Sequence, residues 1–460
     1  MIENQTKTIS QAQSEGNSWV TWAKLLGCSL FGIGFFLTPF VYEGSWTIAL
    51  GVVSNVFTSL IGENMKYFTC SIFIIGALLS VIYNLTPRSF STRLPHSEKF
   101  IASHWLWTLL SVIGGVTAGM TLFQVGPEWV IAKETGVTAY IDVAGAIFLL
   151  IGLGCLFLPF LTDYGLLDFV GTLLQKGFHK AFNLPGRATI DTLASWVGSS
   201  SIAVVMTNYQ YKQGYYSARE SAVIATNFSV VSIPFVLLTA QVAGIESHFL
   251  QLYGSMLLIC ILCAVITPKL PPLSTFKDDY YGGKEKQLNE HVGEGEKRLN
   301  CAMQRAIVTA KRSPSPAQSV NKGFWSMIDI YLMMMPAAMT IEFITLSVYY
   351  NTGILQAMSY PLYLMLDALQ VPEARLAAPG LFIGLMDQFV PTIIASNISD
   401  PFTKFILAGL SVTQLIFFAE TAILIMRSAI PITILQLVSI FIIRTIIAFP
   451  ILYGIAHMLF

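Results

Sequence analysis

About nine apolar segments of membrane-spanning length dominate this chain. A helix needs roughly 20 consecutive apolar residues to cross a bilayer. The segments cover residues 23–41, 67–85, 105–124, 140–161, 221–244, 249–267, 325–349, 402–426 and 431–458. The chain is 54% hydrophobic and only 11% charged, a balance typical of membrane proteins. We therefore predict an all-α polytopic membrane protein with about nine spans.

Charge and motif content exclude several function classes. The 26 basic and 26 acidic residues balance, so the chain lacks the basic footprint of a nucleic-acid-binding protein. No Walker motif, catalytic triad or HExxH motif is present, and the histidines lack metal-ligand spacing. Cys260 and Cys263 lie inside an apolar span, where core packing is expected rather than redox chemistry. We expect neither an enzyme nor a cofactor or metal site.

Lysine and arginine are unevenly distributed between the loops. The loops that are rich in these residues are 86–104, 162–187 and 268–323, whereas 126–139, 245–248 and 351–378 are poorer. The positive-inside rule places the rich loops in the cytoplasm. Residues 1–22 are polar and do not resemble a cleaved signal peptide, so we expect them to be a cytoplasmic tail. The predicted location is the bacterial inner membrane, with several passes and a cytoplasmic N-terminus.

One apolar segment, residues 188–207, is interrupted at Gly198-Ser199-Ser200-Ser201. Each arm is too short to cross a bilayer. Broken backbone at membrane depth survives only inside protein or beside a water-filled cavity, because unsatisfied N–H and C=O groups are costly there. The segment both follows and precedes positively charged residues. We therefore predict a re-entrant hairpin that enters from the cytoplasm and forms part of a solute site.

A second segment, residues 379–396, is interrupted at Asp387-Gln388 and Pro391. Each half of the chain then follows one order: span, amphipathic helix, interrupted hairpin, span, span. The first spans of the two halves run in opposite directions, so the repeat is inverted, and paired interruptions predict a transporter site at the repeat interface. The predicted divisions are a three-span scaffold over 23–138, repeat 1 over 139–267, a flexible cytoplasmic linker over 268–323 and repeat 2 over 324–460. A regulatory role for the linker is the alternative.

Polar side chains inside spans are costly and therefore informative. In the first half, the predicted solute-binding residues are Ser199, Ser200, Ser201, Thr226, Asn227 and Ser229. Freed N–H groups and a helix N-terminus at the serines suit a carboxylate, a phosphate or a polar ring. Thr226 and Ser229 share a helix face that can look at the hairpin. Small residues also mediate helix contacts in membranes, which is the alternative explanation.

In the second half, Asp387 and Gln388 are the strongest pair, and Gln414 lies on a face near Glu420. A carboxylate in a span normally faces water, a partner or an ion. We therefore predict that Asp387, Glu420 or Glu342 binds a proton or sodium ion and couples it to solute movement. For Glu420, an ion pair with Arg427 or Arg444 is the alternative.

The stretch from Leu184-Pro185-Gly186-Arg187 to the Gly-Ser interruption, continuing through Tyr211 to Thr226, resembles the YjiH-type bacterial membrane proteins with a gate, or nucleoside-recognition, domain. More distantly, the arrangement looks like that of concentrative nucleoside transporters. In those transporters, two hairpins and the following spans form the solute site. The resemblance adds Thr392 to the predicted residues and supports 199–201, 226–229 and the span with Glu420. The chain differs at Ser200-Ser201-Ile202-Ala203-Val204, where those transporters carry a carboxylate-proline signature.

Together these features predict a secondary-active transporter, coupled to protons or sodium, for a small polar organic solute. Its expected partners are the lipid bilayer, the solute and either a second copy or another gate-domain membrane protein. A gate-domain subunit that does not transport and acts with a membrane partner is the main alternative. A channel is the third possibility, although the sequence has no ring of like charges.

Overall fold

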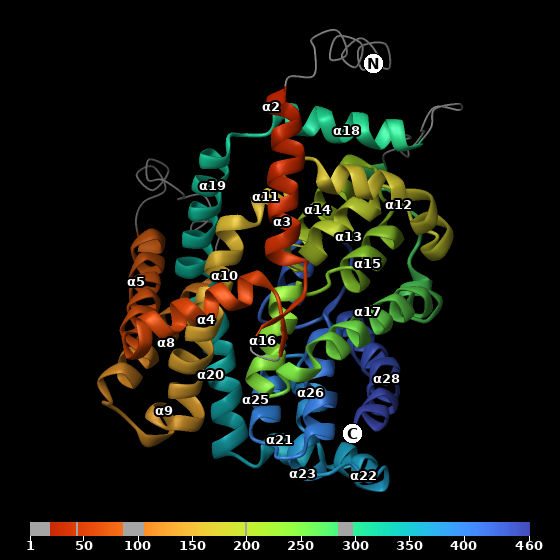
Figure 1. Ribbon diagram of the computed structural model, residues 1–460. Helices are drawn as coiled ribbons and strands as arrows, with labels where there is room; N and C mark the ends of the chain where they lie inside the picture. Colours follow the sequence, from red (N-terminus) through yellow and green to blue (C-terminus); the bar gives the residue numbers. More distant parts are fainter. Residues whose placement is uncertain (1–18, 43–44, 86–104, 198–199, 284–297) are drawn as a thin grey trace.

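The computed structural model describes residues 19–42, 45–85, 105–197, 200–283 and 298–460, and it is almost entirely helical. Within this part of the chain, strands β1 (Phe40–Tyr42) and β2 (Ser45–Thr47) form a short antiparallel ribbon. Seven helical stretches of the described residues are long and apolar enough to cross a bilayer. The predicted all-α polytopic class is confirmed (Figure 1).

The helices divide into three runs along the chain. Up to the first interrupted segment they are α2 (Trp19–Trp22), η1 (Ala23–Cys28), α3 (Ser29–Phe36), α4 (Ala49–Ile61), η2 (Gly62–Asn64), α5 (Met65–Leu85), α8 (Trp105–Phe123), α9 (Glu128–Ile131), η3 (Lys133–Val143), α10 (Ala144–Phe157), α11 (Pro159–Thr162) and α12 (Leu166–Phe182). The middle run contains α13 (Ala188–Val197), α14 (Ser200–Gln213), α15 (Ala218–Asn227), α16 (Ile233–Ala243), η4 (Glu246–His248), α17 (Phe249–Ile266), η5 (Thr267–Lys269), η6 (Leu273–Thr275), η7 (Tyr281–Gly283) and α18 (Arg298–Arg312). The last run contains α19 (Pro316–Asp329), η8 (Ile330–Met334), α20 (Met335–Asn351), α21 (Ile354–Met358), α22 (Tyr360–Ala368), α23 (Ala374–Ala377), α24 (Gly380–Ile383), α25 (Val390–Ser396), α26 (Pro401–Thr413), α27 (Thr421–Arg427) and α28 (Ile434–Leu459).

Two of the predicted spans are not continuous helices. The span predicted over 221–244 consists of α15 and α16, separated by non-helical residues 228–232. The span predicted over 402–426 consists of α26 and α27, separated by residues 414–420. We call residues 228–232 break 1 and residues 414–420 break 2. Pro234 has no N–H to donate and stands one residue into α16, which helps to end the preceding helical ladder at break 1.

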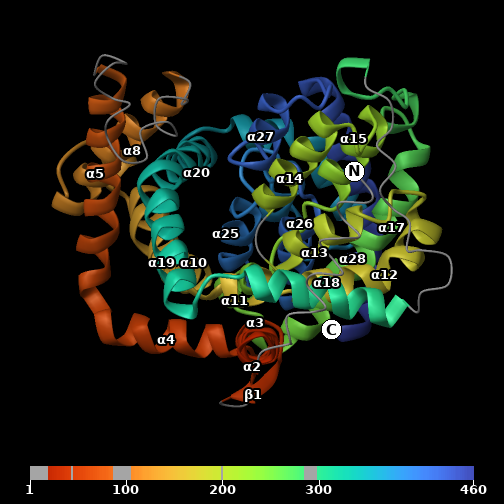
Figure 2. The ribbon, with the colours of Figure 1, turned by 90° about the horizontal axis from the view of Figure 1, so that it is seen from above.

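The helices form two groups, which Figure 2 shows on opposite sides of the molecule. The scaffold group consists of α5, α8, η3, α10, α19, η8 and α20, which contact one another. The hairpin group consists of α13 to α17 and α24 to α28. The largest buried apolar cluster joins the groups, from Phe73 and Phe343 of the scaffold group to Phe389 and Leu410 of the hairpin group.

Glycines allow the scaffold helices to approach closely. A Cβ added at Gly76 of α5 would lie 2.6 Å from the carbonyl oxygen of Leu332. A Cβ at Gly114 of α8 would collide with Oγ1 of Thr340 on α20. Small residues permit such contacts in membranes, where apolar burial alone gives helices little reason to associate. The N-terminal spans therefore pack directly on the first helix of the second half.

The two predicted hairpins lie toward opposite ends of the molecule. Figure 1 shows α13 and α14 at the end that carries α2, α12 and α18, and α25 at the end that carries α21 and α23. Contacts join α13 to α14 and α24 to α25. This arrangement is the one expected if one hairpin enters from each side of the membrane.

The expectation of a flexible linker over 268–323 needs correction for its described residues. Residues 298–312 form α18, which packs on α12. Its buried face carries Ala302, Ala306 and Ala310, spaced four residues apart on one side of the helix. In addition, Nζ of Lys24 donates to the carbonyl oxygen of Ser313 at 2.8 Å. This segment is therefore bound to the body of the protein.

Candidate functional site

The C-terminal ends of α15 and α26, which lead into breaks 1 and 2, meet at one buried side chain, Arg444 of α28. We call this place the crossing. Its exposed fraction is 0%. Its guanidinium donates to the carbonyl oxygens of Thr413, at 2.7 Å from Nη2, and of Gln414, at 3.1 Å from Nε. It also donates from Nη1 to Oδ1 of Asn227, at 2.9 Å, and to the carbonyl oxygen of Thr226, at 3.5 Å. Arg444 thus joins the C-terminal ends of α15 and α26.

Those helix ends explain how a positive charge can be buried at this place. The last carbonyls of a helix have no intrahelical partner, and each helix C-terminus carries roughly half a negative charge. Two such ends together balance one guanidinium. The hydrogen-bond partners of Arg444 among the described residues are all neutral, including Sγ of Cys260 at 3.8 Å. Glu420 is not among these hydrogen-bond partners of Arg444.

Hairpin 1, formed by α13 and α14, covers break 1. Oγ of Ser195 in α13 donates to the carbonyl oxygen of Val230, at 3.0 Å. In α14, Oδ1 of Asn208 accepts from the N–H of Ala429 at 2.9 Å, just after α27. The hairpin therefore satisfies polar backbone groups of both interrupted spans. Such pairing is required where backbone is irregular at membrane depth.

Hairpin 2, formed by α24 and α25, covers break 2 in a similar way. The N–H groups of Phe418 and Ala419 donate to the carbonyl oxygens of Leu385 and Met386, at 2.8 and 3.0 Å. Nε2 of Gln414 donates to the carbonyl oxygen of Leu381 at 2.7 Å. Helix α25 also contacts α16, as α14 contacts α27. Each hairpin thus touches the second helix of the interrupted span in the opposite half.

Break 2 contains a sharp reversal at Leu415, whose φ is +60°. The N–H of Ile416 donates across it to the carbonyl oxygen of Gln414 at 2.8 Å. Side chains other than glycine rarely adopt a positive φ, and such conformations cost about 1–3 kcal/mol. The surrounding contacts of Arg444 and hairpin 2 hold this conformation in place.

The predicted solute-binding residues of the first half make different kinds of hydrogen bond. Oγ1 of Thr226 and Oγ of Ser229 donate to the carbonyl oxygens of Ala222 and Ala225, one helical turn earlier, at 2.8 and 2.7 Å. Asn227 instead holds Arg444 and accepts from Oγ1 of Thr267 at 2.8 Å. Ser199 lies outside the described residues, as do the side chains of Ser200 and Ser201.

The predicted second-half residues gather around hairpin 2. Oδ1 of Asp387 accepts from the N–H of Phe389 at 2.7 Å. Oγ1 of Thr392 donates to Oγ of Ser411 at 2.9 Å, and Ser411 donates to the carbonyl oxygen of Gln388. The side-chain oxygens of Gln388 and Gln414 are buried and have no hydrogen-bond partner among the described residues. The site therefore offers unused acceptors.

The predicted ion-coupling residues fall into two places. Glu342 of α20 has an exposed fraction of 0%, and neither of its carboxylate oxygens has a partner among the described residues. It interacts electrostatically with Asp387, which is 6% exposed. Glu420, in contrast, stands at the start of α27 and is partly exposed. Glu342 and Asp387 therefore interact with each other, and Glu420 is placed separately at a helix start.

Sequence reasoning missed three residues that build this site. Arg444 was considered only as a partner for Glu420, although an arginine inside a long apolar helix is itself a signal of function. Ser195 and Ser411 gave no signal, because a serine that binds a distant carbonyl cannot be told from one that binds its own helix.

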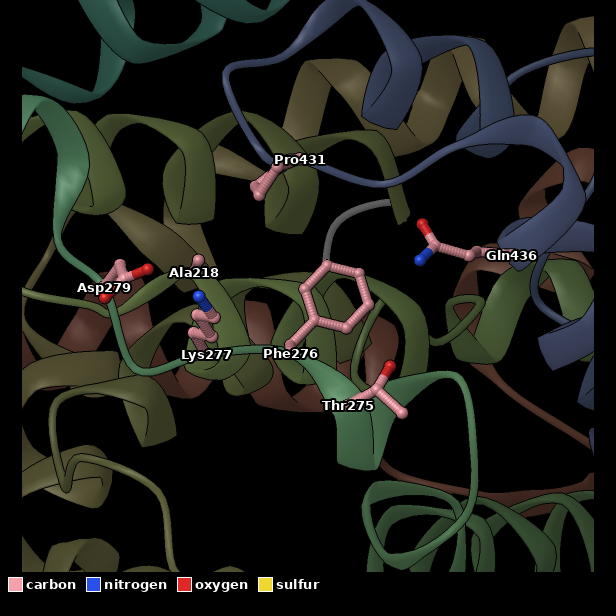
Figure 3. A pocket seen from close by; sticks show the side chains of 7 residues that line it. All are labelled: Ala218, Thr275, Phe276, Lys277, Asp279, Pro431 and Gln436. Carbon is pink, nitrogen blue, oxygen red and sulfur yellow. The ribbon is translucent and has the colours of Figure 1, made fainter.

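A separate surface cavity of about 240 Å³ lies beside the starts of α15 and α28. Its lining residues are Ala218, Thr275, Phe276, Lys277, Asp279, Pro431 and Gln436. Figure 3 shows Phe276 in the middle of the view, between Lys277 and Gln436. None of the predicted site residues lines this cavity, so it is distinct from the crossing of the breaks.

Comparison with known proteins gives two findings. A family model described as gate, nucleoside recognition, matches residues 144–246, which run from the start of α10 to just beyond the end of α16. An uncharacterised protein of Alkalihalophilus pseudofirmus is 36% identical over 465 residues, covering 100% of both chains. No solved structure matches. The match with the family model includes hairpin 1 and break 1.

Proposed function

We propose a transport function from the premise that this chain belongs to the gate-domain membrane proteins, in one family with the Alkalihalophilus pseudofirmus relative. Gate-domain proteins are linked to the movement of nucleosides and other solutes across membranes. For this chain we propose secondary-active, ion-coupled transport of a small polar organic solute. We place it in the bacterial inner membrane with the N-terminus in the cytoplasm.

The crossing of two interrupted spans is the observation that carries this proposal. Breaks 1 and 2 place helix ends and irregular backbone inside the protein, and each break is covered by its own hairpin. Interrupted helices at the interface of two repeats are typical of transporter substrate sites. The matching order of elements in 139–267 and 324–460 supports an inverted repeat. A protein with only a structural role would have little need for paired interruptions.

Contacts between the two groups suggest where the path opens and closes. Near one end, the guanidinium of Arg427 lies 5.8 Å from the ring centroid of Trp107, which links α27 to α8. Near hairpin 2, Nδ2 of Asn397 donates to the hydroxyl of Tyr350 at 2.9 Å, which links the end of α25 to α20. We propose that these contacts open in turn as the hairpin group moves against the scaffold group.

The proposed solute site lies between the hairpins. The proposed solute contacts are Ser199, Ser200 and Ser201, which follow α13 in the sequence, and Asp387, Gln388, Thr392 and Gln414 around hairpin 2. Thr226, Asn227 and Ser229 complete the wall at break 1. The unused side-chain oxygens of Gln388 and Gln414 favour a solute with hydrogen-bond donors.

Flux through purified protein in liposomes tests the proposal. The vesicles carry an inward proton or sodium gradient, and the probes are labelled uridine, adenosine and a panel of amines and amino acids. We expect at least one probe to accumulate only when a gradient is present. Asp387→Asn and Ser200→Leu should abolish that accumulation in protein that still folds, whereas Asp367→Asn, on exposed α22, should leave it unchanged.

Two results would contradict transport. One is the absence of gradient-dependent flux for every probe, and the other is full flux in both site variants. If flux is absent and one other membrane protein co-purifies in fixed ratio, the chain is a gate-domain subunit that does not itself transport.

A further inference from the structure

The carboxyl groups of Glu342 and Asp387 lie across the boundary between the two helix groups. Glu342 belongs to α20 of the scaffold group, and Asp387 stands at the tip of hairpin 2. Helix α20 contacts α25. Two carboxylates that interact at a buried boundary repel each other when both are ionised. The protonation state of this pair therefore affects how strongly the two helix groups hold together.

The two members of the pair have different surroundings. Asp387 accepts a backbone N–H from Phe389, which stabilises its ionised form. Glu342 has no such donor: both its oxygens are buried and unpartnered among the described residues. An ionised carboxylate without a partner is very costly to bury, so such a group normally takes up a proton or a cation. The other described titratable side chain that interacts with Glu342 is Tyr140 of η3.

Glu342 and Asp387 do not belong to a cluster of metal-binding side chains among the described residues. The described residues contain no group of three or more histidine, cysteine or acidic side chains able to hold a metal ion. One oxygen of Asp387 is already used by the backbone. A proton, in contrast, needs only a single oxygen and no coordination shell.

We propose that Glu342 binds one proton at the boundary of the two groups, with Asp387 as the fixed negative charge beside it. In the protonated state the groups stay in contact. When Glu342 loses the proton, its negative charge and that of Asp387 repel each other. This repulsion favours separation of hairpin 2 from α20. The binding of the proton is a property of the site itself. Its use as the coupling ion rests on the proposed transport function.

Two measurements on purified protein test proton binding without any solute. The first is the infrared C=O band of a protonated carboxylic acid at neutral pH. We expect the band to be present, to be absent in Glu342→Gln, and to remain in the exposed control Asp367→Asn. In Asp387→Asn the band should disappear at a lower pH than in the unmodified chain, because the neighbouring negative charge is gone.

The second measurement is the melting midpoint as a function of pH, in sodium chloride and in choline chloride at equal ionic strength. The native chain holds a proton that the unfolded chain releases, so stability should fall as pH rises. This change amounts to up to tenfold in the unfolding equilibrium for each pH unit. The glutamine side chain in Glu342→Gln resembles the protonated acid in shape but does not titrate. The melting midpoint of this variant should therefore depend less on pH. The two salts should give equal midpoints.

Each contrary result overturns the inference. A midpoint raised by sodium over choline, and no longer raised in Glu342→Gln, would make this a sodium site. An infrared band that survives in Glu342→Gln would place the proton elsewhere. If Glu342→Gln fails to fold, the infrared band of Asp387→Asn still tests proton binding. A band that disappears at the same pH as in the unmodified chain would overturn the inference. Absence of flux alone would instead refute transport and leave proton binding intact.

Discussion

Arg444 illustrates how a single residue can connect two distant parts of a chain. Its guanidinium bonds to carbonyl oxygens at the ends of α15 and α26, which are almost two hundred residues apart in sequence. A lysine has one compact charge and cannot reproduce the planar set of donors that reaches both ends. We conclude that this arginine, rather than local sequence, fixes the geometry of the crossing.

Removal of Arg444 should therefore be strongly destabilising. Arg444→Leu leaves the carbonyl oxygens of Thr413 and Thr226 without this donor, and each buried acceptor left unsatisfied costs about 1–3 kcal/mol. Arg444→Lys should recover only part of this loss. The measurement is the thermal midpoint in detergent. Arg427→Gln is the matched control, because Arg427 is exposed and its substitution should change stability little. A midpoint for Arg444→Leu equal to that of the unmodified chain would refute this role.

At the residue scale, the sequence identified polar residues but not their partners. Asp387 and Glu342 were predictable as candidates because acidic residues are rare inside spans. Their juxtaposition was not predictable, since it depends on packing between α20 and hairpin 2. The same limit applies to Thr226 and Ser229, whose hydroxyls bond back to their own helix.

At the scale of elements, the two breaks have different origins. Break 1 is followed by Pro234, a local signal that a helix is interrupted. Break 2 contains neither glycine nor proline between Gln414 and Glu420. Its conformation depends on distant groups, namely the guanidinium of Arg444 and the carbonyl oxygens of Leu385 and Met386. Sequence patterns therefore predicted a continuous span there. The amphipathic α18 was missed because its fully buried residues are alanines, with Met303 and Ile307 packed beside them.

The contact between hairpin 2 and break 2 can be tested at Gly384. A Cβ at this position would collide with Oε1 of Gln414 and would lie 3.3 Å from Pro391. Gly384→Ala should displace the Gln414 amide and cost roughly 1–3 kcal/mol, as overpacking does. Gly454→Ala is the matched control, since no atom lies within 4 Å of its added Cβ and alanine is the better helix former. The thermal midpoint of Gly384→Ala should fall below that of Gly454→Ala. Equal midpoints for the two variants would contradict the predicted contact.

At the scale of the whole molecule, the buried apolar cluster joins the two helix groups, and three polar contacts cross the same boundary. These polar contacts are Arg427 with Trp107, Asn397 with Tyr350, and the Glu342–Asp387 pair. The first and second are weak, partly exposed interactions, which are easily broken and remade. The crossing at Arg444, in contrast, is fully buried within the hairpin group. Movement between the groups would break these polar contacts and leave the hydrogen bonds of Arg444 intact.

Cross-linking of the groups during flux is the most direct test of movement between them. In a chain whose six native cysteines are replaced, cysteines are introduced in pairs at Tyr350 and Asn397, or at Trp107 and Arg427. A bifunctional thiol reagent with a cleavable bond then joins each pair in proteoliposomes. We predict that either link stops gradient-driven flux and that cleavage restores it. Undiminished flux with both links fully formed would contradict such movement.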